Sequence, residues 1–159
     1  MEKTIPLHLQ EIIFSSSVPE ISRQLSQLEN EGKIRKIASR IFTPLFDEPI
    51  EAIIKRNLFQ IIGHLYPGSV LSHRSAFEFT PTKSGHIFIT YHYTKKIVLP
   101  GVILRLLEGP GPIEGDNPIS GELFASQKAR AFLENLQQFK YTGATSKCLQ
   151  VSELEEKLE

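Results

Sequence analysis

The fold of the N-terminal part is decided by Ser17 to Pro44, SVPEISRQLSQLENEGKIRKIASRIFTP. Ser17 stands three residues before Glu20, the spacing of a capping box in which each side chain accepts a backbone N–H from the other position. Pro19 falls in the first turn, where its missing donor costs nothing. Apolar residues then recur at helical steps, at Val18, Ile21, Leu25 and Leu28. The pattern predicts an amphipathic helix over residues 18–31, ended by Gly32.

A short basic hairpin is expected after this helix. Residues 33–37 and 40–43 alternate in strand fashion around a predicted turn at Ala38 and Ser39. Four cations and no acid lie within eight residues, at Lys33, Arg35, Lys36 and Arg40. A helix that leads into a basic hairpin is typical of a small winged helix. The head is abbreviated, because only one further short helix, over Leu7 to Phe14, is predicted before it.

A winged-helix head points to DNA. Lysine and arginine on a wing displace the counterions condensed on phosphates, while polar side chains on the helix bond base edges in a major groove. The predicted DNA-binding residues are Arg23, Gln24, Gln27, Lys33, Arg35, Lys36 and Arg40. The alternative is a helix and hairpin that dock on the rest of the protein.

Composition sets the broad class. The 159 residues hold 18 basic and 18 acidic side chains and are 40% hydrophobic, the profile of an ordinary folded protein. Residues 1–46 and 47–107 carry net charges of +1 and +3, and residues 108–159 carry −4. The single cysteine, Cys148, excludes an internal disulfide and an all-cysteine zinc site, so a cytoplasmic location is expected. No apolar run is long enough to span a bilayer and no signal peptide is recognised, so no membrane partner is expected.

The rest of the chain predicts a mixed domain. One helix is expected over Ile50 to Tyr66, and strands over residues 69–71, 77–79, 86–93, 97–99 and 102–107. The glycine-rich and proline-rich stretch 109–121 is expected to be a loop, and Phe124 to Phe139 a helix. Ser152, with Glu155 three residues later, predicts the start of a last helix that the chain does not finish, which leaves open that it is cut from a longer protein.

These elements together predict the fold class and its parts. The class is α+β, with an abbreviated winged-helix head at residues 1–46 and a mixed α/β domain with an antiparallel-rich sheet at residues 47–150. Residues 151–159 would begin the C-terminal helix.

Catalytic chemistry has little support in the sequence. The only aspartates are Asp47 and Asp116. The histidines do not have the spacing of metal ligands, and the sequence contains no glycine-rich phosphate-binding loop. No catalytic residue, metal or cofactor is therefore expected. A hydrolase or nuclease site around His73, Arg74 and Glu78 is kept as the weakest alternative.

Two polar stretches have alternative interpretations. Ser72 to Ser75 could bind an anion or a partner, but a helix cap in which Arg74 pairs with a glutamate is favoured. Tyr91 to Lys96 could stack on nucleic acid, although strand tyrosines more often pack against the core.

Ordered segments along most of the chain resemble a known family. They are KIRKIASRIFTP, EAIIKRNLFQII, PGSVLSHRSAFEF, GHIFIT, LPGVILRLLEGPGP and ASQKARAFLENL. This series resembles the N-terminal, antitoxin-like region of proteins that carry a Fic domain, which is itself similar to AbiEi-family antitoxin and transcriptional-regulator modules. The AbiEi-type modules usually have a glycine where Arg40 stands. The Fic motif, with its catalytic histidine and anion loop, is absent from the sequence.

The resemblance implies a winged-helix head, carried by residues 18–31 and 33–43, before a mixed α/β domain with a structural turn at Leu99 to Gly101. It also implies DNA binding or autoregulation. The expected function is a non-catalytic regulatory module of a toxin-antitoxin or Fic-associated system, with DNA as partner. The alternative is a protein-interaction domain that binds a toxin or recruits substrate for a linked Fic domain.

Overall fold

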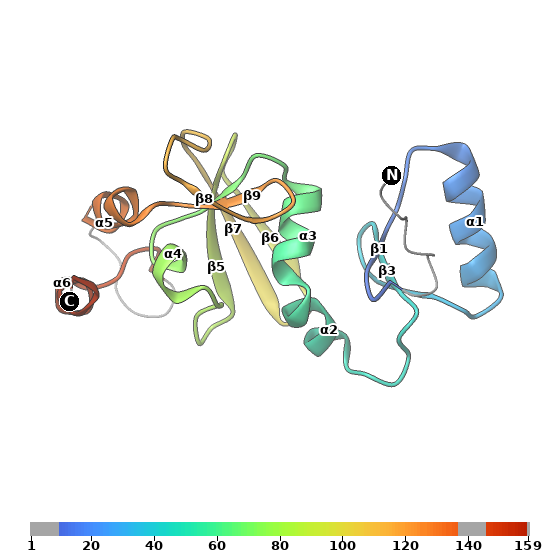
Figure 1. The fold of residues 1–159 in the computed structure, drawn as a ribbon. Coiled ribbons are helices and arrows are strands. Elements are labelled where there is room, and N and C mark those ends of the chain that lie inside the picture. Colours follow the sequence, from blue (N-terminus) through green and yellow to red (C-terminus); the bar gives the residue numbers. More distant parts are fainter. Residues whose placement is uncertain (1–9, 137–145, 159) are drawn as a thin grey trace. The chain divides into compact units, whose positions relative to one another are not determined.

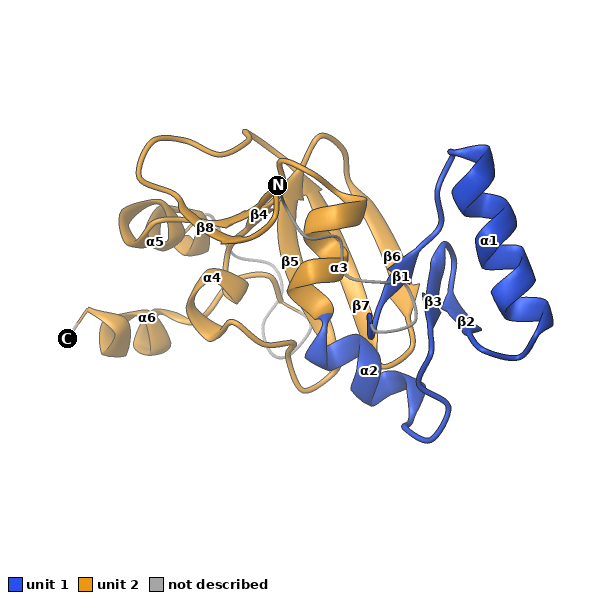
Figure 2. Cartoon of the chain, turned by 45° about the vertical axis from the view of Figure 1, so that its right-hand side comes forward, with its two compact units in different colours: residues 1–57 blue, residues 58–159 orange. Residues whose placement is uncertain are grey.

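The computed structural model describes residues 10–136 and 146–158 (Figure 1). The chain divides into two compact units, residues 1–57 and 58–159 (Figure 2). The described residues form six helices, a three-stranded sheet and a six-stranded sheet, and most strand pairs are antiparallel. The predicted α+β class and the antiparallel-rich sheet are thereby confirmed. The division falls after Asn57, whereas the sequence predicted a boundary after Phe46.

The first unit is a small three-stranded sheet with two helices. Its elements are β1 (Ile13–Phe14), α1 (Pro19–Asn30), β2 (Arg35–Ala38), β3 (Ile41–Thr43) and α2 (Ile50–Arg56). The strand order is β1-β3-β2, and both pairs are antiparallel. Buried Ile13, Leu25 and Ile34 form its core, with Leu28 and Phe42 packed against them.

The segment before α1 differs from the prediction. Of the helix expected over residues 7–14, residues 7–9 lie outside the described residues, and residues 10–14 are not helical. Ile13 and Phe14 pair with Phe42 and Ile41 instead. Ile12, which precedes β1, and Ile13 within it are both buried. Pairing with β3 therefore outweighs the helical spacing of this short apolar run.

Helix α1 starts and ends by different means. Its N-cap is Val18, with no side-chain cap, so the predicted Ser17 and Glu20 capping box is wrong. Pro19 does occupy the first turn, and Ser16 Oγ accepts the Val18 N–H at 3.1 Å. At the other end Gly32 has φ +73°, as predicted for the residue that ends the helix.

Two backbone hydrogen bonds complete that C-terminal cap. The N–H of Lys33 donates to the carbonyl of Leu28, and the N–H of Gly32 donates to that of Glu29. This is a Schellman motif, and it fixes the direction in which the chain enters the hairpin.

The turn of the hairpin lies one residue later than predicted, at Ser39 and Arg40. The register between β2 and β3 shifts between Lys36 and Ala38, which adds one residue to the first strand. Arg40 has φ +66°, the left-handed conformation that favours glycine. The AbiEi-type modules usually carry glycine at the position of Arg40, and the backbone conformation found there is one that suits glycine.

The helix expected over residues 50–66 is interrupted at Asn57. It consists of α2 and α3 (Leu58–Leu65), and Asn57 between them has φ −108° and ψ 18°. The Asn57 side-chain amide donates to the Ile53 carbonyl at 2.9 Å, competing with the helical hydrogen bonds there. Arg56 and Asn57 both bind Glu11, and Arg56 also binds Glu48. These contacts join the end of α2 to the segments before β1 and before α2 in the same unit.

The second unit contains the larger sheet. Its strands are β4 (Val70–Leu71), β5 (His86–Tyr91), β6 (Lys95–Leu99), β7 (Val102–Glu108), β8 (Asn117–Ser120) and β9 (Leu123–Ala125), in the order β6-β7-β5-β4-β9-β8. The pairs β5–β7 and β4–β9 are parallel and the other three are antiparallel. Residues 86–90 of the central strand β5 are all buried, which means that both of its faces are covered.

Three expected elements of this unit differ in the structure, two in kind and one in where it starts. Residues 75–78 form the helix α4 (Ser75–Glu78), where a strand over 77–79 was expected. Part of the expected loop 109–121 is β8, and Leu123–Ala125 is a strand, so α5 (Lys128–Leu136) starts later than predicted. Short strands such as β8 and β9 are formed by pairing, and their own sequences carry little period.

The last helix, α6 (Val151–Lys157), begins with a capping box formed by Gln150 and Glu153. The predicted cap at Ser152 with Glu155 is therefore wrong by two residues. No described helix combines the length and the apolar character needed to cross a membrane.

Candidate functional site

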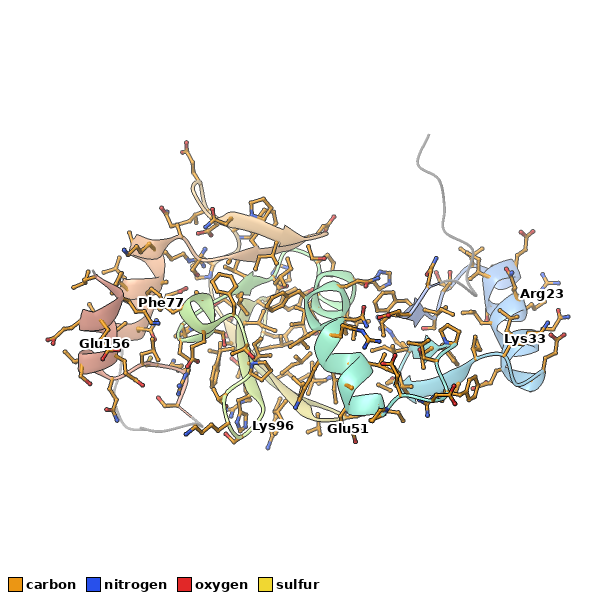
Figure 3. The ribbon with its side chains drawn as sticks, turned by 60° about the horizontal axis from the view of Figure 1, so that its bottom comes forward. Arg23, Lys33, Glu51, Phe77, Lys96 and Glu156 are labelled. Atoms are coloured by element: carbon orange, nitrogen blue, oxygen red, sulfur yellow. The ribbon has the colours of Figure 1, made fainter. Side chains whose placement is uncertain are left out.

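All seven predicted DNA-binding residues lie in the first unit, on α1 and on the basic hairpin that follows it. All but one of them are exposed: Arg23, Gln24, Gln27, Lys33, Lys36 and Arg40. Arg23 and Gln27 are four residues apart and share the helix face opposite Leu25, which is buried. Figure 3 shows Arg23 on the side of α1 that faces away from the sheet.

Arg35 is the exception. Its Nε donates to the Leu45 carbonyl at 2.9 Å, and its second terminal nitrogen donates to the Glu48 carbonyl at 2.7 Å. The guanidinium also lies 5.5 Å from the centre of the Phe46 ring. Arg35 therefore holds the loop between β3 and α2, and two of its five N–H donors are already used by backbone carbonyls.

Lys33 is exposed but paired. Its Nζ lies 2.9 Å from Glu31 Oε2, and Gln27 Nε2 donates to Glu31 Oε1 at 2.9 Å. These two contacts, Lys33 first, lower the pKa of Glu31 below its usual value. The Lys33 side chain is 63% exposed, so solvent screens the pair and a phosphate could displace the carboxylate.

The side chains of Lys36 and Arg40 are exposed to solvent. Within residues 10–136 and 146–158, neither side chain makes an ion pair or a side-chain hydrogen bond. Arg23 makes only a long hydrogen bond of 3.4 Å, to the Pro19 carbonyl. Of the seven predicted residues, the cations without an ion pair or a short side-chain hydrogen bond among the described residues are therefore Arg23, Lys36 and Arg40.

In the second unit, Ser72 to Ser75 is a hydrogen-bonded core feature. Arg74 makes two hydrogen bonds to the Glu78 carboxylate, of 2.7 and 2.9 Å, which confirms the predicted pairing of Arg74 with a glutamate. Ser72 does not cap a helix. Its hydroxyl accepts from Thr90 Oγ1 at 2.8 Å and lies 2.9 Å from His73 Nδ1.

The aromatic residues near the end of β5 pack on one another. The Tyr91 ring lies 5.5 Å from the Tyr66 ring, 5.3 Å from that of Tyr93 and 4.6 Å from that of His92. These contacts favour the packing interpretation, although Tyr93 is 44% exposed beside the exposed Lys95.

Sequence reasoning missed two partners of His73. Glu134 Oε1 accepts the His73 N–H at 3.2 Å, and Thr90 reaches the ring through Ser72. Glu134 stands 61 residues from His73, so no local spacing signals the contact. Among the described residues, no three His, Cys, Asp or Glu side chains gather in a way that could hold a metal ion.

Comparison of the chain with protein-family models, with curated proteins and with solved structures found no match.

Proposed function

We propose that the first unit is an abbreviated winged-helix module that binds DNA. The observation that carries the proposal is that α1 leads, through a fixed Schellman turn, into a hairpin with exposed, unpaired cations at Lys36 and Arg40. In this arrangement the hairpin contacts phosphates, and α1 presents its polar outer face to the groove.

The roles of the seven residues are unequal. Arg23, Lys36 and Arg40 contact phosphates, and Gln24 and Gln27 are the candidates for base contact because amides bond base edges. Lys33 contributes once Glu31 releases it. Arg35 supports the fold of the hairpin and adds positive potential without direct contact.

The proposed role is regulatory and non-catalytic, as in a toxin-antitoxin or Fic-associated system in the cytoplasm. Its support is the resemblance of the ordered segments and the short basic hairpin. Between residues 19 and 43 the sequence holds five basic and three acidic side chains, a small excess that suits moderate, salt-sensitive binding.

The test is fluorescence anisotropy of the full chain on a mixed-sequence duplex over a salt series. The variant Lys36→Ala with Arg40→Ala is expected to weaken binding and to flatten the dependence of affinity on salt. The matched control is Lys95→Ala with Lys96→Ala, which removes two exposed cations from a strand of the second unit. Binding that is lost only in the control would transfer nucleic-acid contact to the aromatic end of β5 and refute the proposal.

A second function, protein interaction, is favoured by exposed apolar side chains on α5, on α6 and at the C-cap of α6. Leu136 is 55% exposed, and Val151 and Leu158 are 64% and 66% exposed. Figures 1 and 2 both show these two helices side by side. Helices with uncovered apolar residues are common at docking surfaces for a toxin or a linked domain.

The second function has its own test. The full chain is co-expressed with the product of the adjoining gene, and Val151→Glu with Leu158→Glu is compared with the unchanged chain. Loss of co-purification in the variant, with DNA affinity intact, would support protein interaction. Equal recovery of both forms would count against it.

A further inference from the structure

A pocket of about 350 Å³ opens in the second unit, apart from the residues proposed to bind DNA. It lies where the ends of β5 and β7, the loop after β7 and α5 come together, and Lys147 also lines it. Its apolar lining includes Leu107, Ile113 and Leu133. The volume is at the lower end of the range of small-molecule sites, which suits a ligand of about ten heavy atoms.

The polar end of the pocket is built around the His73 ring, which is 7% exposed. Thr90 Oγ1 donates to Ser72 Oγ, so the single hydroxyl proton of Ser72 is left to donate to His73 Nδ1. We assign Nδ1 as the acceptor of that proton, because the Ser72 hydroxyl would otherwise have no acceptor among the described residues. Burial, with the nearby charges of Lys147 and Arg130, lowers the pKa of His73 to about 4, so the ring is neutral at pH 7. With Nδ1 as the acceptor, we assign the ring proton to Nε2.

This Nε2–H has no hydrogen-bond partner among the described residues. Among the described residues, the fully buried side-chain polar atoms without a hydrogen-bond partner are the hydroxyls of Ser69 and Ser126. The Nε2 atom of His73 also has no partner but is not one of these buried atoms, so it keeps accessible surface. A histidine nine-tenths buried, fixed at one nitrogen and open at the other, is a donor prepared for an acceptor on a ligand.

Another part of the pocket lining is held in place by Arg130. Its guanidinium donates to the carbonyls of Pro110 and Gly111 and to the carboxylates of Asp116 and Glu134. Asp116 in turn accepts two backbone N–H groups, and its side chain is fully buried. The loop after β7 is thereby fixed as a pocket wall before any ligand arrives.

The remaining charges in the pocket are mixed. Lys147 supplies one ammonium, and Glu108 and Glu134 supply two carboxyl groups, while Arg130 pairs with both Asp116 and Glu134. Two carboxyl groups disfavour a phosphate or another multiply charged anion. The set is complementary to a ligand that carries an acceptor anion and a cationic donor close together on an apolar body.

We propose that this pocket binds a free amino acid with an apolar side chain. The carboxylate of the amino acid accepts from the His73 Nε2–H and from Lys147. Its ammonium group meets the carboxylates of Glu134 and Glu108, and its side chain lies against Leu133 and Ile113.

The proposal is tested by isothermal titration of the full chain with L-leucine and L-phenylalanine. Saturable binding is expected, with a Kd at or below about 1 mM. N-Acetyl-L-phenylalanine lacks the ammonium and L-phenylalaninamide lacks the carboxylate, and both are expected to bind at least tenfold more weakly. Equal affinity for either analogue, binding of inorganic phosphate alone, or no binding up to about 10 mM would each overturn the proposal.

Three variants locate the site. His73→Asn, which tolerates the left-handed backbone, is expected to weaken binding at least tenfold. Leu133→Trp places a bulky ring at a position that is 64% exposed, so it should block the pocket and leave the fold intact. The matched control, His92→Asn on an exposed histidine of the same unit, is expected to bind normally.

A spectroscopic measurement separates binding from a structural role. The ¹⁵N shifts of the His73 ring are expected to report the Nε2–H form in the free chain and to move on addition of L-phenylalanine, while those of His92 stay unchanged. Ring shifts of His73 that do not move at saturation would overturn the proposed contact.

Discussion

Single side chains decide whether the basic hairpin is a binding surface. The sequence places Lys33, Arg35, Lys36 and Arg40 in one acid-free run, but the structure gives them different partners. Spacing predicts which residues are charged and near one another. It does not predict that the carbonyls of Leu45 and Glu48, ten and thirteen residues away, take up Arg35.

Arg35 and Lys36 are neighbours with opposite expected effects. Arg35→Ala leaves two carbonyls without their donors and is expected to lower the free energy of unfolding by about 1–3 kcal/mol. Lys36→Ala removes an exposed side chain and should change it by no more than about 0.5 kcal/mol. Urea denaturation of both variants checks this, and equal effects would contradict the structural role of Arg35.

Arg40 is expected to separate stability from binding. Its left-handed backbone suits glycine, so Arg40→Gly should raise the free energy of unfolding, by up to about 1 kcal/mol. The same change removes a proposed phosphate contact and should weaken DNA binding. Thermal unfolding and anisotropy on one preparation give both values, and a loss of stability would show that the side chain supports the turn.

His73 is expected to make stability depend on pH. The unfolded chain takes up a proton near pH 6.5, whereas the folded ring does so near pH 4. The free energy of unfolding should therefore fall as the pH is lowered from 6.5 to 4, by up to about 3 kcal/mol. Burial raises the pKa of Glu134, which acts in the opposite direction.

The share of His73 is isolated by His73→Asn, measured beside the unchanged chain by urea denaturation at pH 7, 6, 5 and 4.5. The difference in stability between the two proteins should shrink toward low pH. A constant difference would mean that the ring does not titrate between these values.

At the scale of elements, amphipathic periods predict α1 and the glycine cap well. The alternation over residues 86–93 predicts β5, which ends two residues earlier, and the strand expected over residues 102–107 is β7. The failures share a cause. The strands β1, β8 and β9 have two to four residues each and exist because another strand lies beside them. The pocket was equally beyond prediction, since it depends on contacts between segments far apart in the sequence.

Helix α3 is expected to be sensitive at Gly63. A Cβ at this position would lie 2.5 Å from the Ser120 carbonyl oxygen, which is backbone and cannot swing aside. Gly63→Ala should therefore lower the free energy of unfolding by about 1–3 kcal/mol, despite the better helix propensity of alanine. The control, Gln60→Ala on the exposed part of α3, should be nearly neutral, and similar results for both would contradict the close packing of α3 on the end of β8.

At the scale of the whole molecule, the charges balance within each unit as well as overall. Residues 1–57 hold eight basic and eight acidic side chains, and residues 58–159 hold ten of each. The asymmetry between thirds of the sequence therefore does not survive as an asymmetry between the folded units. Any attraction to DNA must come from the layout of a few cations in the first unit.

This balance sets the expected salt dependence of the full chain. With Arg23, Lys36 and Arg40 as phosphate contacts, the logarithm of the affinity should fall against the logarithm of salt with a slope of about −3. Anisotropy between low and physiological salt measures it. A slope near zero would leave the first unit without an electrostatic role, and a much steeper one would require cations that the proposal leaves out.

The order of strands in the larger sheet governs how the chain can be made. The parallel pairing of β5 with β7 and of β4 with β9 joins residues such as Val70 and Phe124, which are synthesised far apart in time. When the nascent chain has been synthesised as far as β5, neither β7 nor β9 exists yet. One edge of the apolar strand β5 is therefore unpaired until β7 has been made. We therefore expect this unit to fold more slowly than one whose strands pair only with their neighbours in sequence.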